Sequence, residues 1–167
     1  MMAPWVVLVG PPGSGKTTVG GILAQRLGLG FRDTDADVEA EAGSAIADIF
    51  VEHGEPHFRA LERAAVARAL TEHNGILSLG GGSILDAQTR KDLCSHRVVF
   101  LDVSLADAAR RVGLDTSRPL LLGNVRGQLK QLMDARRPLY GEVAMLIVST
   151  DGREPEDVAA EIMRTIR

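Results

Sequence analysis

The stretch at residues 10–17 constrains this chain more than any other part of its sequence. It reads Gly-Pro-Pro-Gly-Ser-Gly-Lys-Thr and fits the pattern G-x-x-x-x-G-K-[ST]. Its glycines let the backbone turn tightly, so that successive N–H groups can face the oxygens of one phosphate. An apolar run at residues 5–9 precedes the loop, and residues 18–27 follow it with helical spacing. The stretch therefore predicts a site for a nucleoside triphosphate at the start of a helix.

The side chains at the end of this loop suit phosphate chemistry. The ammonium group of Lys16 can reach the β- and γ-phosphates, and the hydroxyl of Thr17 can ligate Mg²⁺. The alternative is a glycine-rich turn that joins a strand to a helix and binds nothing. We expect the nucleotide to contact a continuous run of residues: Gly13, Ser14, Gly15, Lys16, Thr17 and Thr18.

Apolar, strand-like runs alternate with stretches of helical spacing along the whole chain. We expect strands at residues 5–9, 31–34, 76–79, 98–103 and 145–149. We expect helices at residues 15–27, 37–42, 46–53, 55–73, 86–95, 105–112, 127–136 and 154–166. This alternation predicts an α/β fold of three layers, with a five-stranded parallel sheet flanked by helices on both faces. Ligands of such sheets bind beyond the carboxyl ends of the strands, so every loop that follows a strand is a candidate site.

Composition limits the class of protein. At 167 residues the chain suits a single domain, 1–167, with a substantial core. No segment has the run of about eighteen apolar residues that a membrane helix needs, and too few residues precede the first strand for a signal peptide. The single cysteine, Cys94, cannot form an internal disulfide, and a net charge of −3 attracts neither nucleic acid nor acidic membranes. We expect a cytoplasmic monomer that binds small molecules.

Three aspartates, Asp33, Asp35 and Asp37, alternate after the second expected strand. In an extended loop, alternate side chains lie on one side of the backbone. One carboxylate could hold Mg²⁺ through water while another orients and deprotonates an acceptor hydroxyl. The simpler alternative is that Asp35 or Asp37 caps the next helix. We assign Asp33 and Asp35 to function and Asp37 to the cap.

The third expected strand runs straight into Gly80, Gly81 and Gly82. Three glycines at the carboxyl end of a strand leave room for a ligand against bare backbone, with N–H groups free to donate. A plain flexible loop is the alternative. We expect the segment to form part of a binding site.

Two other segments are longer than simple connections. Helical residues between the second and third strands suggest a substrate-binding insertion at about 34–60, in which the pattern alone makes Arg59 a surface salt-bridge residue. Residues 113–125 form a long loop that contains glycine and proline residues and has Arg118 in its middle. A loop of this length in a compact domain is typical of a lid, and a lid arginine can neutralise charge on a transferring phosphate.

Together these motifs resemble those of shikimate kinases, from residue 5 to about residue 164. The order is the same as in that family, and the combination is far more specific than the phosphate loop alone. Beyond that loop, the matching segments are Asp-Thr-Asp at 33–35, Ser-Ala-Ile-Ala-Asp-Ile-Phe at 44–50, Gly-Glu-Pro-His-Phe-Arg at 54–59, Leu-Gly-Gly-Gly at 79–82, Arg-Pro-Leu-Leu at 118–121 and Arg-Arg-Pro-Leu-Tyr at 136–140.

The resemblance implies roles for the residues near the phosphate loop. Lys16 and Thr17 would hold phosphate and Mg²⁺, and Asp33 would reach the metal through water. Asp35 would bind the hydroxyls of shikimate and act as base toward the one that is phosphorylated. The residues that would line the shikimate pocket with backbone are Gly80, Gly81 and Gly82.

The resemblance also divides the arginines between ligands. Arg59 and Arg136 would bind the carboxylate of shikimate, which overturns the salt-bridge interpretation of Arg59. Arg118 would be the lid arginine at the phosphates, and two others would lie near the adenine, Arg111 and Arg153. Arg137 stands beside Arg136 and leaves open whether the two share a role. We expect Pro138 to push Arg137 out of the helical region, so that its side chain leaves the helix at a different angle.

The activity implied is direct, in-line transfer of the γ-phosphoryl group of MgATP to the 3-hydroxyl of shikimate, with Lys16, Asp35 and Arg118 as catalytic residues. This reaction belongs to aromatic amino-acid biosynthesis. One alternative is a phosphotransferase similar to gluconate kinases or nucleoside-monophosphate kinases, which share the loop and lid but are not expected to combine three glycines with Arg59 and Arg136. A second alternative is a non-catalytic, nucleotide-binding regulatory module, which a missing Lys16 or Asp35 would have favoured.

Overall fold

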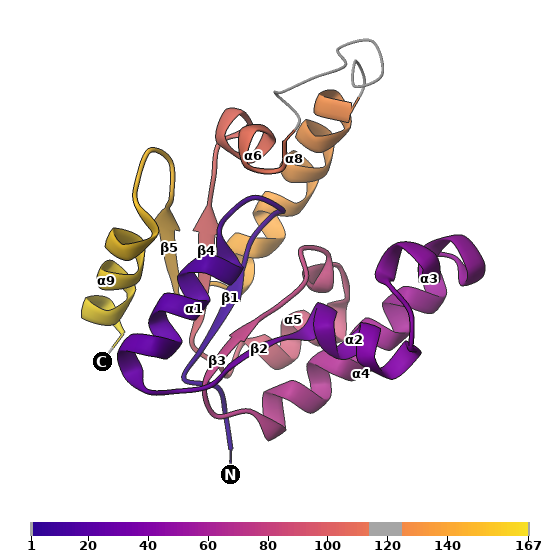
Figure 1. Cartoon of the computed structure of the whole chain (residues 1–167), viewed down its shortest axis with the longest axis horizontal. Coiled ribbons are helices and arrows are strands. Elements are labelled where there is room, and N and C mark those ends of the chain that lie inside the picture. The colour runs from indigo at the N-terminus through magenta and orange to yellow at the C-terminus, as the bar shows by residue number, and fades with distance from the viewer. Residues whose placement is uncertain (1, 114–124, 167) are drawn as a thin grey trace.

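Five parallel strands form the centre of the molecule. The computed structural model describes residues 2–113 and 125–166. The strands pair in the order β2-β3-β1-β4-β5, and every pairing is parallel, so the predicted sheet is confirmed. The central strand, β1, leads into the phosphate loop (Figure 1). The strands are β1 (Val6–Val9), β2 (Phe31–Asp33), β3 (Ile76–Ser78), β4 (Val98–Asp102) and β5 (Leu146–Ser149).

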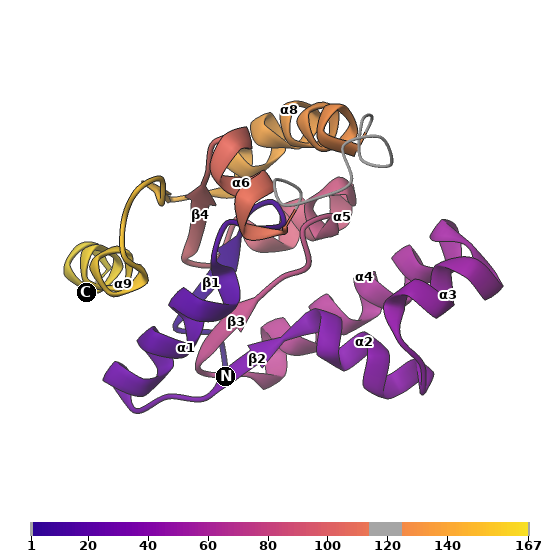
Figure 2. The ribbon, with the colours of Figure 1, turned by 45° about the horizontal axis from the view of Figure 1, so that its top comes forward.

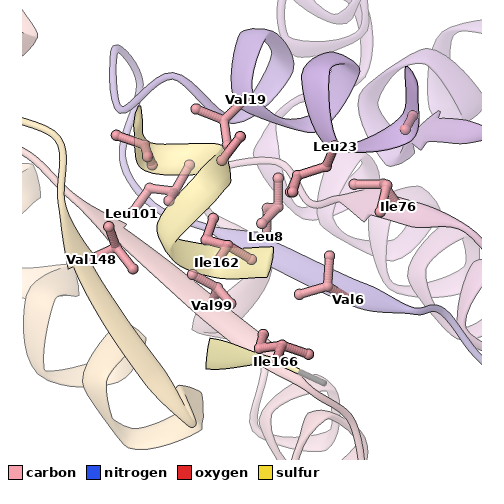
Figure 3. Packing of buried hydrophobic residues seen from close by; sticks show 13 residues of the cluster. Val6, Leu8, Val19, Leu23, Ile76, Val99, Leu101, Val148, Ile162 and Ile166 are labelled. Atoms are coloured by element: carbon pink, nitrogen blue, oxygen red, sulfur yellow. The ribbon is translucent and has the colours of Figure 1, made fainter. Parts of the chain in front are cut away.

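Helices cover both faces of the sheet. On one face lie α1 (Lys16–Leu27) and α9 (Pro155–Thr165), whose apolar side chains meet those of the strands. Figure 3 shows this cluster, in which Leu8 and Val99 of the sheet lie among side chains of both helices. The opposite face is covered by α4 (Glu55–Glu72), α5 (Ala87–Leu93) and α8 (Val125–Val143). The molecule therefore has the three layers that the alternation of strands and helices predicts.

The central strand reads as an uninterrupted apolar run because both of its faces are covered. Successive side chains of a strand point to opposite faces of the sheet. Val6 and Leu8 accordingly belong to the cluster under α1 and α9, whereas Val7 and Val9 belong to the cluster under α4, α5 and α8. All four residues are buried, so β1 is fixed firmly at the base of the phosphate loop.

A group of helices extends from one side of the sheet. It consists of α2 (Thr34–Ala42), α3 (Ile46–His53) and the first turns of α4. These helices pack around a small core of their own, made by Val38, Ile49, Phe58 and Ala65. Figure 2 shows the group on the side of the sheet away from α9. The predicted insertion at about 34–60 falls within it.

The remaining described elements are η1 (Ser83–Leu85), a single 3₁₀ turn, and α6 (Leu105–Arg111). α6 packs against α8 through Val103, Ala108 and Met133. The predicted lid at 113–125 lies almost wholly outside the described residues, and so does Arg118. Within residues 2–113 and 125–166, every helix is too short or too polar to cross a membrane.

Two helices differ from their predicted bounds by more than two residues. α2 begins at Thr34 and not at Asp37, because Asp33 accepts a hydrogen bond from the backbone N–H of Asp35 (2.9 Å) and caps the helix earlier. α8 runs through Pro138 to Val143. Side chains on both sides of the proline are buried, Met133 against α6 and Tyr140 and Val143 against the sheet. This packing outweighs the loss of one backbone hydrogen bond. The expectation that Pro138 pushes Arg137 out of the helical region is therefore wrong.

Candidate active site

Loops from neighbouring strands meet at one edge of the sheet and enclose a cavity of about 470 Å³. The phosphate loop follows β1, Asp33 ends β2, and Gly80 and Gly81 follow β3. All of them line the cavity, together with Lys16 and Asp35. The cavity thus lies beyond the carboxyl ends of the strands, where parallel sheets bind their ligands.

The phosphate loop has the backbone conformation that its glycines predict. Gly13 and Gly15 have φ angles of 81° and 94°, which residues with side chains rarely adopt. A Cβ atom at Gly13 would also lie 2.9 Å from the carbonyl oxygen of Ala108. Gly15 is the N-cap of α1, and the first turn of that helix, whose N–H groups have no partner within the helix, lines the cavity. This arrangement is suited to an anion at the helix N-terminus.

Five of the six residues predicted to contact the nucleotide line this cavity, namely Gly13, Gly15, Lys16, Thr17 and Thr18. The sixth, Ser14, is fully buried and lines an adjoining cavity of about 170 Å³. Its backbone N–H donates to the carbonyl oxygen of Pro11 (3.1 Å) and so closes the turn of the loop.

The side chain of Lys16 folds back onto its own loop. Its Nζ donates to the carbonyl oxygens of Gly10 (2.6 Å) and Pro11 (3.2 Å). Burial lowers the pKa of Lys16 to about 8, although the nearby carboxylates of Asp35 and Asp33 oppose this shift. Among the described residues, no carboxylate forms an ion pair with Lys16. The ammonium group therefore has only neutral acceptors to exchange for a phosphate oxygen.

Asp33 and Asp35 face the cavity, and Asp37 does not. Asp37 pairs instead with Arg32 (2.7 Å). The reason is that α2 already includes both Asp35 and Asp37, and residues two apart on a helix lie about 200° apart around its axis. The interpretation of Asp37 as the cap is wrong, since Asp33 caps the helix, and the acids do not share an extended loop.

The two carboxylates in the cavity hold their protons more tightly than ordinary aspartates. Burial, together with the nearby charges of Asp33 and Glu62, raises the pKa of Asp35 to about 6. Burial also raises the pKa of Asp33, against the hydrogen bond that its carboxylate accepts from the backbone of Asp35. A carboxylate with a pKa close to neutral beside a buried lysine is typical of a site for acid–base chemistry.

We call Gly80, Gly81 and Gly82 the glycine wall, because charged side chains lie against them. A Cβ atom at Gly80 would lie 2.5 Å from Oδ1 of Asp35. One at Gly82 would overlap the guanidinium group of Arg59, and one at Gly81 would lie 3.6 Å from Nη1 of Arg136. The wall therefore brings together three predicted site residues that come from three different helices, α2, α4 and α8.

Arg59 is held by carboxylates of its own helix as well as facing the wall. It pairs with the exposed Glu55 (3.2 Å) and with Glu62 (2.8 Å), whose side chain is only 5% exposed. Arg59 therefore forms the salt bridge that the pattern predicts, and it also lies where the resemblance implies. Glu62 is a site residue that the sequence analysis missed. Its signal was visible, since it is the one acid between Phe58 and Ala69 and lies on the buried stripe of α4 that carries them.

Arg136 and Arg137 are neighbours on α8 but point to different surroundings. Arg136 is half-buried beside Gly81, and within the described part of the chain no carboxylate pairs with it. Arg137 pairs with Asp102 at the end of β4 (2.9 Å) and donates to the carbonyl oxygen of Val103 (3.4 Å). Successive residues of a helix lie about 100° apart around its axis, and this rotation separates the two side chains.

The two arginines predicted near the adenine lie beside the phosphate loop, and Arg111 also lines the large cavity. Both Arg111 and Arg153 line the cavity of about 170 Å³ that adjoins the larger one. Arg111 donates to Thr150, through both its hydroxyl (2.9 Å) and its carbonyl oxygen (2.8 Å), and to the carbonyl oxygen of Gly13 (3.0 Å). Arg153 pairs with Glu161 (2.8 Å). Arg118 lies outside the described residues.

The donor set in the large cavity suits Mg²⁺. Thr17 offers a hydroxyl and Asp33 a carboxylate, and Mg²⁺ prefers such oxygen ligands. Within the described ranges, no group of three or more His, Cys, Asp or Glu side chains forms a cage for a metal. A metal that takes most of its ligands from phosphates and water fits this arrangement, whereas one that needs a complete protein cage does not.

Comparisons with known proteins show the family to which the chain belongs. The family model described as shikimate kinase matches residues 12–167. The chain is 60% identical over 161 residues to shikimate kinase of Salinispora arenicola, covering 96% of each chain, and 57% identical over 163 residues to that of Thermobifida fusca, covering 98% of this chain and 95% of the relative.

Solved structures give the same result. A structure described as shikimate kinase from Acinetobacter baumannii in complex with shikimate superposes with a TM-score of 0.89 at 36% identity, covering 99% of this chain and 93% of that one. Shikimate kinase from Aquifex aeolicus superposes with a TM-score of 0.81 at 30% identity, covering 96% of this chain and 94% of that one. The chain belongs to the shikimate kinase family of ATP-dependent kinases.

Proposed function

We propose that this enzyme transfers the γ-phosphoryl group of MgATP to the 3-hydroxyl of shikimate, giving shikimate 3-phosphate and ADP, through the residues described above. The observation that supports the proposal most directly is the glycine wall, which faces an acid and two arginines beside the phosphate loop. Shikimate carries hydroxyls and one carboxylate, so its recognition needs an acceptor for the hydroxyls and cations for the carboxylate. The similar structure from Acinetobacter baumannii was determined in complex with shikimate.

On the nucleotide side, Lys16 leaves the carbonyl oxygens of its own loop and bonds the β- and γ-phosphates. Thr17 and Asp33 would hold Mg²⁺, which when bound neutralises charge on the phosphate oxygens. The first turn of α1 supplies backbone N–H groups to the same phosphates. Arg111 and Arg153, which line the adjoining cavity, would lie beside the adenine. The role of Arg118, as a cation over the transferring group, is carried over from the family resemblance.

On the acceptor side, the oxygen of the 3-hydroxyl forms a bond to the γ-phosphorus. Asp35 accepts the proton that this hydroxyl loses. The bond between that phosphorus and the bridging oxygen breaks in line, and the electron pair leaves with ADP. The pKa of about 6 leaves Asp35 ionised at neutral pH yet close enough in basicity to take the proton. Arg59 and Arg136 bind the carboxylate at the other end of the ring, where planar guanidinium groups can form paired hydrogen bonds.

We also propose how the chain is divided and where it works. A single domain, 1–167, contains the substrate-binding insertion at about 34–60 and a lid at about 113–125. The enzyme acts as a monomer in the cytoplasm, and the single, exposed Cys94 supports a reducing compartment. Sedimentation of the purified chain over a range of concentrations tests the monomer, because a dimer would sediment faster at higher concentration.

An assay of ATP consumption tests the reaction, with shikimate, gluconate and AMP offered side by side. We expect turnover with shikimate and little above background with the other two. Turnover with gluconate or AMP would support one of the related phosphotransferases. ATP binding without consumption in all three mixtures would support a regulatory module.

A further inference from the structure

Two hydroxyls within the family motifs have no part in the reaction proposed above. Thr34 stands between the two aspartates of the Asp-Thr-Asp segment, and Tyr140 ends the Arg-Arg-Pro-Leu-Tyr segment. Neither residue lines the large cavity. Both nevertheless reach the glycine wall. The backbone N–H of Gly80 donates to Oγ1 of Thr34 (3.3 Å), and the hydroxyl of Tyr140 donates to the carbonyl oxygen of Gly81 (2.5 Å).

Both hydroxyls are held in place by burial. Thr34 is 0% exposed and Tyr140 is 1% exposed. The ring of Tyr140 packs against Phe100 of β4, with 5.0 Å between ring centroids. Burial raises the pKa of Tyr140 to about 12, so the phenol keeps its proton and remains a donor at any pH at which the enzyme works. Buried polar groups that pair with backbone fix the position of that backbone.

The glycine wall needs such support because it has no side chains of its own to pack. Its shape decides where three charged groups lie, since Cβ atoms at Gly80 and Gly82 would collide with Asp35 and Arg59 and one at Gly81 would lie close to Arg136. A glycine segment is also the most flexible kind of backbone. The position of the wall must therefore be fixed from outside it.

Each hydroxyl joins the wall to the helix that carries a charged site residue. Thr34 opens α2 and directly precedes Asp35. Tyr140 lies on α8 one turn after Arg136, on the same face of that helix. The two hydrogen bonds thus set the distances from the wall to the carboxylate and to the guanidinium group.

We propose that Thr34 and Tyr140 are positioning residues of the acceptor site, with Thr34 placing Asp35 and Tyr140 placing Arg136 against the glycine wall. The inference rests on the roles proposed for Asp35 and Arg136. It assigns different kinetic effects to the two hydroxyls. Loss of the Tyr140 hydroxyl loosens the carboxylate end of the site and so weakens shikimate binding. Loss of the Thr34 hydroxyl misplaces the base and so slows the chemical step.

Steady-state kinetics of the full-length chain test the proposal, with shikimate and ATP varied in turn. For Tyr140→Phe we expect the KM for shikimate to rise about tenfold, with the KM for ATP within about twofold of wild type. For Thr34→Val, which keeps the shape of the side chain, we expect kcat to fall about tenfold. Thr34→Ser keeps the hydroxyl and should restore kcat to within about threefold of wild type.

Phe100→Leu is the matched control, because it removes packing from the ring of Tyr140 but no hydrogen bond to the wall. We expect a lower melting temperature for this variant with unchanged KM for both substrates. If Tyr140→Phe behaves like Phe100→Leu, or if Thr34→Val and Thr34→Ser have the same kcat, the two hydroxyls only stabilise the fold and the inference is wrong. If Tyr140→Phe does not fold, the two Thr34 variants decide. An inactive wild-type chain would overturn the proposed function itself. Failure of the proposed function is therefore distinguishable from failure of the inference about Thr34 and Tyr140.

Discussion

Replacing Arg136 by alanine is the sharpest test of the acceptor site, because the next residue provides a control on the same helix. Arg136 is half-buried beside Gly81, and no described carboxylate neutralises it. A substrate carboxylate would be its ion-pair partner. Losing one partner of such a buried pair costs about 2–5 kcal/mol. This corresponds to roughly a thirtyfold to several thousandfold loss of affinity for shikimate.

The same substitution at Arg137 should cost far less. The side chain of Arg137 is 53% exposed, and its partner Asp102 is 29% exposed. An exposed ion pair contributes about 1 kcal/mol or less, and Arg137 does not face the glycine wall. Arg137→Ala should therefore change the KM for shikimate by less than about fivefold.

Both variants are measured with shikimate varied at saturating MgATP, and then with ATP varied at saturating shikimate. We expect a large rise in the KM for shikimate for Arg136→Ala alone, with the KM for ATP unchanged in both. Arg136→Lys keeps the charge but not the planar fork, so it should fall between Arg136→Ala and wild type. A larger loss for Arg137→Ala than for Arg136→Ala would show that the wrong arginine has been assigned to the carboxylate.

Four further predictions concern the phosphate loop, the acids and the wall. Lys16→Ala should lower kcat by about 10²–10³-fold, because one preorganised contact to the transferring group is lost, and near-normal turnover would refute that role. Asp35→Asn should abolish turnover while ATP still binds. Asp33→Asn should instead raise the Mg²⁺ concentration needed for half-maximal rate. If added Mg²⁺ restores the activity of the Asp35 variant alone, the two roles are reversed. The kcat/KM for ATP should fall as pH drops below about 6, where Asp35 gains a proton, and again above about 8, where Lys16 loses one; a flat profile from pH 5 to 9 would contradict both. Gly80→Ala should lower kcat because its Cβ displaces the Asp35 carboxylate, whereas Gly127→Ala, with open space around it, should not; equal rates would argue against the wall.

The parts of this structure that follow from local sequence were predictable. Each strand is an apolar run and each helix has its own periodicity, so all five strands were placed to within a residue or two. The phosphate loop is equally local, since the positive φ angles fall on its own glycines. The loops at the carboxyl ends of parallel strands lie at one edge of the sheet, and this rule correctly predicted that Asp33, Gly80 and Gly81 line the same cavity.

The wrong predictions have different causes, one local in the chain and one distant. Asp37 was taken for a cap because an aspartate before a helix is typical of one. The hydrogen bond from Asp33 started the helix earlier and left Asp37 to pair with Arg32. Pro138 was expected to end α8, but α8 is packed against α6 before the proline and against the sheet after it. A proline inside a helix has a free-energy cost, and the burial of other side chains of the same helix can stabilise the helix by more than that cost.

The glycine wall shows most clearly what a sequence leaves undecided. Three successive glycines predict free space beside the backbone, but they do not predict which side chains occupy it. In the structure, that space is taken by side chains of α2, α4 and α8, which come from far apart in the chain. Asp35 and Arg59 lie so close to Gly80 and Gly82 that a methyl group would displace either one, whereas Gly81 leaves slightly more room to Arg136. The identity of the three residues therefore depends on how the three helices pack, and at Gly80 and Gly82 the space that a side chain would need is already filled by charged groups.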